Sequence, residues 1–120
     1  MTHILAVDDS PSMRDMVRIA LSAAGFQVTQ AIDGVEALDA ARKTAFDLVL
    51  SDVNMPRMDG ISLIRALRAE AAYRHTPILM LTTESSADRK REGKEAGATG
   101  WIVKPFDPEL LVATMQRVLR

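Results

Sequence analysis

The stretch Ile4-Leu5-Ala6-Val7-Asp8-Asp9 is a short apolar run that ends in two acidic residues, and its form recurs along the chain. Short, continuous apolar runs follow at Leu48–Leu50, Ile78–Leu81 and Trp101–Val103. Runs of this length without polar alternation are typical of strands that are buried on both faces of a parallel sheet. Residues 26–29 instead alternate between apolar and polar, as expected of a half-exposed edge strand.

Amphipathic helical patterns lie between these runs. Apolar residues recur at helical spacing over residues 13–24, and Gly25 then provides a stop signal. Asp33 and Asp107 are predicted to cap two further helices, and another helix is expected from Gly60 to about residue 70. With one more helix before the last apolar run, strands and helices alternate as five βα units.

The helix before the last apolar run, expected from Ser85 to Ala96, has the weakest pattern. Its residues are polar on nearly every side, and Gly93 in its interior costs about 1 kcal/mol relative to alanine. A helix that is polar all round is either weakly held or available to a partner. The pattern leaves both roles open.

Right-handed crossovers and an edge strand in second position favour a parallel sheet with the strand order 2-1-3-4-5. The predicted fold is therefore α/β: a doubly wound, five-stranded, flavodoxin-like sheet with helices on both faces. In such sheets, ligands bind beyond the carboxyl ends of the strands where the strand order reverses. Here that point lies between the first and third strands.

The composition is that of an ordinary globular protein. The chain has 120 residues, 48% of them hydrophobic, and a net charge of −1, which suits one domain over residues 1–120. A nearly neutral chain gives no support for a nucleic-acid partner, and the lack of cysteine excludes disulfides and thiol catalysis. Without a membrane-length apolar run or a recognisable signal peptide, we expect no membrane insertion and a cytoplasmic location.

Polar residues follow the apolar runs at one predicted edge of the sheet. The first strand ends in Asp8 and Asp9, the third in Asp52, the fourth in Thr82, and the fifth is followed by Lys104. Carboxylates this close raise one another's pKa values unless a cation compensates, and such oxygen ligands suit Mg²⁺. A carboxylate nucleophile with a divalent cation, a hydroxyl and an ammonium suits phosphoryl transfer.

Each of these residues also has an ordinary explanation when it is taken alone. Asp8 and Asp9 could cap the first helix, Asp52 could be a loop aspartate, Thr82 could be structural and Lys104 a surface charge. Coincidence is a poor explanation for the set, because four separate strand ends supply complementary groups to one edge.

In order and spacing, the motifs resemble those of response-regulator receiver domains along the entire chain, and most of all the single-domain chemotaxis regulators. The matching motifs are Asp8-Asp9, Asp52 within Ser51-Asp52-Val53-Asn54-Met55-Pro56, Gly60, Thr82 and Lys104-Pro105-Phe106.

The resemblance implies that Asp52 accepts a phosphoryl group from the phosphohistidine of a sensor histidine kinase. It implies a Mg²⁺ site in which Asp9 and Asp52 are ligands, Asp8 acts mainly through water, and Asn54 contributes its main-chain carbonyl. Lys104 would pair with the phosphoryl group, and its bond to Pro105 is expected to be cis.

The resemblance also assigns a switch to the fourth and fifth strands. Thr82 would turn towards the phosphoryl group, and an aromatic residue on the fifth strand would fill the vacated space. Trp101 stands there, where the family more often has tyrosine or phenylalanine; alternatively, it only covers the sheet edge. Asn54 and Glu84 would set the lifetime of the phosphorylated state, and Thr83 would narrow the access of water.

The expected function is therefore a monomeric phosphoacceptor switch and not an enzyme. Its protein target would bind the face formed by the fourth helix, fifth strand and fifth helix. The basic residues of that helix either belong to this face or are simply solvated: Arg89, Lys90, Arg91 and Lys94.

Three alternatives remain. A receiver with no target would act as a phosphate sink. A small Mg²⁺-dependent aspartyl-phosphate phosphatase usually needs a second acid/base aspartate where Asn54 stands, and a cap domain. A flavodoxin-like cofactor binder is disfavoured because the acidic edge repels an anionic cofactor and no glycine-rich phosphate loop is present.

Overall fold

The computed structural model describes residues 1–82 and 87–119, and it contains the predicted alternation of strands and helices. One short 3₁₀ helix, η1, precedes the fourth strand. The elements are β1 (His3–Val7), α1 (Pro11–Ala23), β2 (Gln27–Ala31), α2 (Gly34–Lys43), β3 (Leu48–Asp52), α3 (Gly60–Arg68), η1 (Ala71–Tyr73), β4 (Ile78–Thr82), α4 (Ala87–Ala96), β5 (Gly100–Val103) and α5 (Pro108–Val118).

The five strands form one parallel sheet in the order β2-β1-β3-β4-β5, which confirms the predicted fold class. In register, Val7 of β1 lies opposite Ser51 of β3, and Asp52 lies opposite Leu81 of β4. The carboxyl ends of the strands are therefore level, so the residues that follow them meet at one edge.

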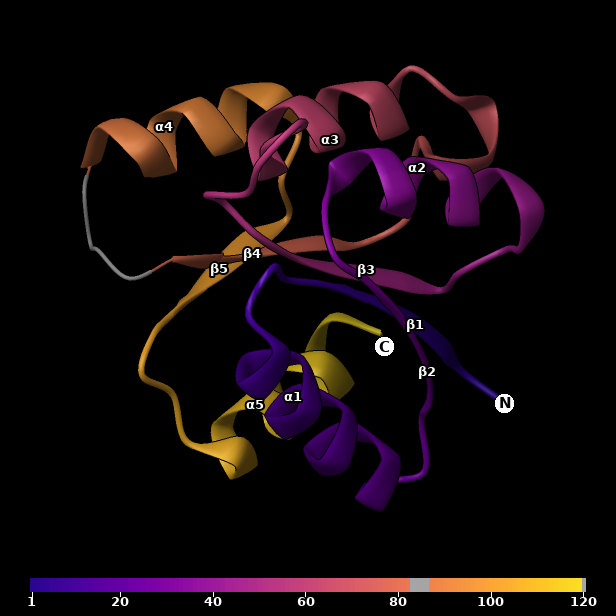
Figure 1. Ribbon diagram of the computed structural model, residues 1–120, viewed down its shortest axis with the longest axis vertical. Helices are drawn as coiled ribbons and strands as arrows, with labels where there is room; N and C mark the ends of the chain where they lie inside the picture. Colours follow the sequence, from indigo (N-terminus) through magenta and orange to yellow (C-terminus); the bar gives the residue numbers. More distant parts are fainter. Residues whose placement is uncertain (83–86, 120) are drawn as a thin grey trace.

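Helices cover both faces of the sheet: α1 and α5 pack on one face, and α2, α3 and α4 pack on the other (Figure 1). Side chains of a strand alternate between these faces. Thus Ile4 and Ala6 of β1 join the core beneath α1 and α5, whereas Leu5 and Val7 join the core beneath the other three helices. Two-sided burial explains why the strand sequences are continuously apolar. Within the described ranges, no helix combines the length and apolar character needed to cross a membrane.

The helix caps show whether Asp8 and Asp9 cap the first helix, which the sequence left open. The side chains of Asp33 and Asp107 accept hydrogen bonds at the starts of α2 and α5, as predicted. The N-cap of α1 is Ser10, whose hydroxyl accepts from the backbone N–H of Met13 at 3.3 Å. The cap of α1 therefore does not account for Asp8 and Asp9.

Helix α4 is described from Ala87 onwards, so the start predicted at Ser85 lies outside the described residues. The structure gives its glycine a place in the packing. Gly93 is buried against β4, where a Cβ atom would lie 2.1 Å from Cε of Met80. Gly93 lets α4 approach the sheet closely, and this packing role is not visible in its helix propensity.

Candidate functional site

Three carboxylates converge where β1 and β3 end. Asp8 and Asp9 follow β1, and Asp52 is the last residue of β3; one oxygen of each lies within 4.8 Å of the others. Asp8 and Asp52 are only 3% and 8% exposed, whereas Asp9 faces solvent. An all-oxygen cluster with one open side suits a hard divalent cation that keeps several waters.

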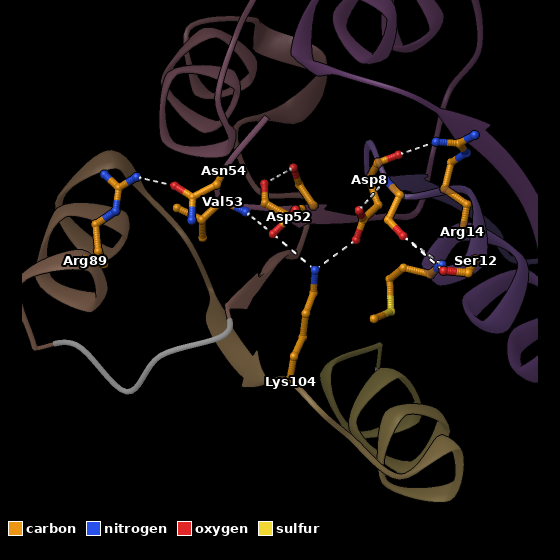
Figure 2. Close-up of polar contacts among 11 residues, drawn as sticks. Asp8, Ser12, Arg14, Asp52, Val53, Asn54, Arg89 and Lys104 are labelled. Atoms are coloured by element: carbon orange, nitrogen blue, oxygen red, sulfur yellow. Dashed lines mark hydrogen bonds and ion pairs between the residues drawn. The ribbon is translucent and has the colours of Figure 1, made fainter. Parts of the chain in front are cut away.

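Lys104 places an ammonium group between two of these carboxylates (Figure 2). Its Nζ donates to Oδ2 of Asp8 at 3.1 Å and lies 3.3 Å from Oδ1 of Asp52. The Lys104 side chain is 11% exposed, and its peptide bond to Pro105 is cis, as expected. Lys104, which follows β5, therefore lies beside the acidic residues, as predicted.

Asp8 is fixed by its neighbours in the chain. Its Oδ1 accepts from the N–H of Ser10 at 2.9 Å, and its carbonyl accepts from Nη1 of Arg14 at 2.7 Å (Figure 2). Sequence reasoning missed Arg14, because it reads as an ordinary solvated residue of α1. Its position in the first turn of α1, which begins just after the acidic pair, is the one sequence feature that could have indicated this contact.

The backbone around Asp52 explains Gly60. Oδ1 of Asp52 accepts from the N–H of Val53 at 2.8 Å, and the N–H of Gly60 donates to the Val53 carbonyl at 2.9 Å. A Cβ atom on Gly60 would lie 2.2 Å from the Asp52 carbonyl oxygen. Helix α3 thus begins directly against the backbone of Asp52. Burial, followed by the Asp8 carboxylate, raises the pKa of Asp52, and Lys104 opposes both effects.

The loop between β3 and α3 is anchored on the start of α2. Arg57, whose φ is 65°, donates from Nε to Oδ2 of buried Asp33 at 2.7 Å. The N–H of Gly34 donates to the Met58 carbonyl at 3.1 Å. The hydrogen bond from Arg57 holds the pKa of Asp33 below its ordinary value. The sequence identified Asp33 only as a cap, and nothing in it pointed to Arg57.

The predicted switch residues lie at the β4–β5 side of this edge. Thr82 ends β4, is buried, and accepts at its carbonyl from the N–H of Lys104 at 2.7 Å. Trp101 is 38% exposed on the edge strand β5, with Nζ of Lys90 5.0 Å from its ring centroid. In this structure the indole therefore lies exposed on the sheet edge, with a cation of α4 over its ring.

Of the residues predicted to tune the phosphorylated lifetime, Thr83 and Glu84 lie outside the described residues. Asn54 is exposed, two positions after Asp52. Its Oδ1 accepts from Nη2 of Arg89 on α4 at 2.8 Å (Figure 2). Sequence reasoning placed Arg89 on the α4 face and did not place it at this site.

Fold and site together define a class: a doubly wound α/β domain whose strand ends hold a buried aspartate, a neighbouring acidic pair and a lysine paired with both. Residues 4–116 match the family described as the response regulator receiver domain. The chain belongs to this family, as its motifs predicted.

Similar proteins extend over nearly the whole chain. Chemotaxis protein CheY-3 of Vibrio cholerae is 41% identical over 116 residues, which cover 96% of this chain and 89% of that protein. The structure of Vibrio cholerae CheY4 is 56% identical, covers 98% of each chain and has a TM-score of 0.95. The receiver domain of sensor histidine kinase PA1611 from Pseudomonas aeruginosa, which holds a magnesium ion in its active-site cleft, is 30% identical, covers 98% of this chain and 97% of that one, and has a TM-score of 0.92.

Proposed function

We propose that this protein is a response regulator that a histidine kinase phosphorylates on Asp52 in a Mg²⁺-dependent reaction, and that it signals through a protein partner in chemotaxis. The observation that carries this proposal is the surroundings of Asp52. Its buried carboxylate lies beside the Lys104 ammonium and within 4.8 Å of both Asp8 and Asp9.

The contacts of Asp52 also support an assignment of its nucleophilic oxygen. Within the described residues, the N–H of Val53 and the Lys104 ammonium both contact Oδ1. We therefore assign the attack to Oδ2. An oxygen–phosphorus bond forms there while the nitrogen–phosphorus bond of the phosphohistidine breaks, and the imidazole nitrogen keeps the electron pair and takes a proton from solvent. Lys104 is placed to pair with the added negative charge.

The residues fit a magnesium ion. Asp9, Asp52 and the Asn54 carbonyl would hold it, with Asp8 acting through water, and when bound it neutralises charge on the transferred group. The all-oxygen cluster supports this assignment, as does the ion in the PA1611 receiver domain.

The names of the relatives support the role in chemotaxis. A kinase donor makes its phosphohistidine from ATP, so we place the protein in the cytoplasm. The target would bind the face formed by α4, β5 and α5, where Trp101 and the α4 cations lie, and the protein would act as a monomer.

The proposed reaction is one stoichiometric phosphorylation and its reversal, with no turnover of other substrates. A phosphatase would instead hydrolyse a phosphomonoester repeatedly. Incubation with p-nitrophenyl phosphate and Mg²⁺ should therefore release no more product than a control without protein. Sustained, protein-dependent release would favour the phosphatase.

Phosphotransfer profiling against the histidine kinases of the source organism tests the proposal and identifies the donor. We expect one kinase to label the wild type far faster than the others, and no kinase to label Asp52→Asn. Beryllofluoride with Mg²⁺ should also change the fluorescence of Trp101, the single tryptophan, in the wild type and leave Asp52→Asn unchanged. An equal fluorescence response from both proteins would refute Asp52 as the acceptor.

A further inference from the structure

Helix α4 contributes a cation to the edge of the acceptor site. Nη2 of Arg89 donates to Oδ1 of Asn54 at 2.8 Å, across 35 positions of sequence. Figure 2 shows the guanidinium reaching from α4 to the loop that follows β3, on the side of Asp52 opposite Asp8 and Arg14. This contact joins α4 to the residue two positions after the acceptor.

The neighbouring basic residues of α4 make different contacts. Nη2 of Arg91 pairs with Asp88 at 2.8 Å on the exposed surface of α4. Nζ of Lys90 lies over the ring of Trp101. The basic residues of α4 therefore do not form one uniformly solvated face. Because Arg91 carries the same charge but does not contact Asn54, it is a control for the position of Arg89.

The chemistry of arginine suits the contact. While Nη2 of Arg89 bonds Asn54, Nη1 lies 3.4 Å from Oε2 of Glu92, one turn further along α4. A planar guanidinium holds two partners in fixed directions, which the single ammonium of lysine does not reproduce. Since Asn54 is exposed, a partner that fixes its carboxamide reduces the freedom of the group beside Asp52.

We propose that Arg89 is a positioning residue of the acceptor site: it fixes the Asn54 carboxamide, ties the β3–α3 loop to α4, and so restricts the access of water to phosphorylated Asp52. Arg89 acts through Asn54, because its Nη2 donates to the Asn54 carboxamide oxygen. The effect on phosphoryl lifetime rests on the function proposed above, whereas the positioning of Asn54 does not.

The first test uses the unphosphorylated protein. Asn54 is the single asparagine, so its side-chain amide gives one assignable pair of NMR signals. Arg89→Ala should shift these signals and increase the fast motion of the carboxamide. Arg89→Lys should restore the wild-type signals only in part, and Arg91→Ala should leave them unchanged. Identical signals in wild type, Arg89→Ala and Arg91→Ala would overturn the positioning role.

The second test follows the loss of the phosphoryl group after the donor is removed. Arg89→Ala should speed the loss by about threefold to tenfold, the size expected for one hydrogen bond. Asn54→Ala should speed it too, and the double variant should be no faster than the faster single variant. Arg91→Ala is the control and should match the wild type.

Two results of the second test would contradict the proposal: equal loss rates in Arg89→Ala and Arg91→Ala, or multiplied effects of Arg89→Ala and Asn54→Ala. A wild type that takes up no phosphoryl group would instead refute the proposed function. The NMR result would still decide whether Arg89 positions Asn54.

Discussion

At the residue scale, Gly60 and Gly93 both lie where a Cβ atom would overlap a neighbour, but the neighbours differ. At Gly60 the neighbour is the backbone carbonyl of Asp52, and at Gly93 it is the flexible end of the Met80 side chain. The backbone there cannot move without displacing Asp52, whereas a methionine side chain adapts readily. Substitution by alanine should therefore lower the free energy of unfolding by different amounts at the two positions.

Gly60→Ala should lower the free energy of unfolding by about 2–3 kcal/mol, at the upper end of overpacking costs. Gly93→Ala should lower it by less than about 1 kcal/mol, because the alanine's helix propensity offsets the displacement of Met80. Urea denaturation of the two variants measures both values. Equal losses would show that the Asp52 backbone adapts as easily as Met80.

The Asp33–Arg57 pair makes a pH prediction. Arg57 lowers the pKa of Asp33 in the folded state, so the charged carboxylate is favoured by folding. The resulting stabilisation is present above the pKa of an unfolded aspartate and is lost as the pH falls through the lower folded pKa. Arg57→Gln should therefore be less stable than the wild type at about pH 7, and the difference should shrink below about pH 4.

Denaturation curves of wild type and Arg57→Gln between about pH 7 and about pH 3 check this. Arg57 is largely exposed, so a moderate salt concentration should also reduce the difference. A difference in stability that is constant over this range would show that the pair contributes nothing through the charge of Asp33.

Single residues also show what the sequence could predict. Asp52, Thr82 and Lys104 were placed at one edge because each follows a recognisable strand and the topology aligns strand ends. The contacts of Arg57 and Arg89 could not be predicted in this way. Their partners lie in loops or at helix ends, and no rule of sequence spacing specifies how those segments are placed relative to one another.

At the scale of elements, Arg68 ties the end of α3 to the segments on either side of β4. Its Nε donates to the carbonyl of Gly97, which follows α4, at 2.9 Å. Its Nη1 donates to the carbonyls of Tyr73 and Thr76, before β4, at 2.7 Å and 2.6 Å. One side chain thus supplies hydrogen bonds to carbonyl groups in two separate segments, and these groups would otherwise depend on water.

Arg68→Met should lower the free energy of unfolding by about 2–3 kcal/mol, because part-buried carbonyls lose their donor. The matched control is Arg65→Met on the exposed side of the same helix, which should change stability by less than about 0.5 kcal/mol. Thermal denaturation of both variants provides the comparison. Similar losses in the two would show that these carbonyls are satisfied without Arg68.

The element that the sequence described least well is α4. Its polar surface and Gly93 left open whether the helix is weakly held or available to a partner, since an amphipathic pattern was the only available criterion. In the structure, the helix packs through Gly93 and Ala96, two residues too small to give a strong pattern, and its long side chains reach Asn54 and Trp101. Helices α1, α3 and α5 were predictable because most of their buried residues are larger and regularly spaced, and α2 was predictable mainly from its cap at Asp33.

At the scale of the whole molecule, the acidic cluster leads to a prediction about Mg²⁺ and stability. Three carboxylates repel one another, so Mg²⁺ should stabilise the folded protein, by about 2.7 kcal/mol at one hundred times its dissociation constant. Asp9→Asn should lose most of this stabilisation. With EDTA, the variant should be at least as stable as the wild type, because it carries one fewer carboxylate.

Thermal denaturation of wild type and Asp9→Asn, with Mg²⁺ and with EDTA, measures these effects. Ca²⁺ at equal concentration tests whether the cluster prefers the smaller cation. The same increase in stability for both proteins on adding Mg²⁺ would place the metal elsewhere.

The central claim is that Asp52 is the phosphoryl acceptor. Intact-mass spectrometry after incubation with acetyl phosphate and Mg²⁺ tests it most directly. The wild type should gain the mass of one phosphoryl group, located in the peptide that contains Asp52, and should gain none in EDTA. Asp52→Asn should remain unmodified. A phosphoryl group on Asp52→Asn to the same extent as on the wild type, or a wild type that stays unmodified, would contradict the claim.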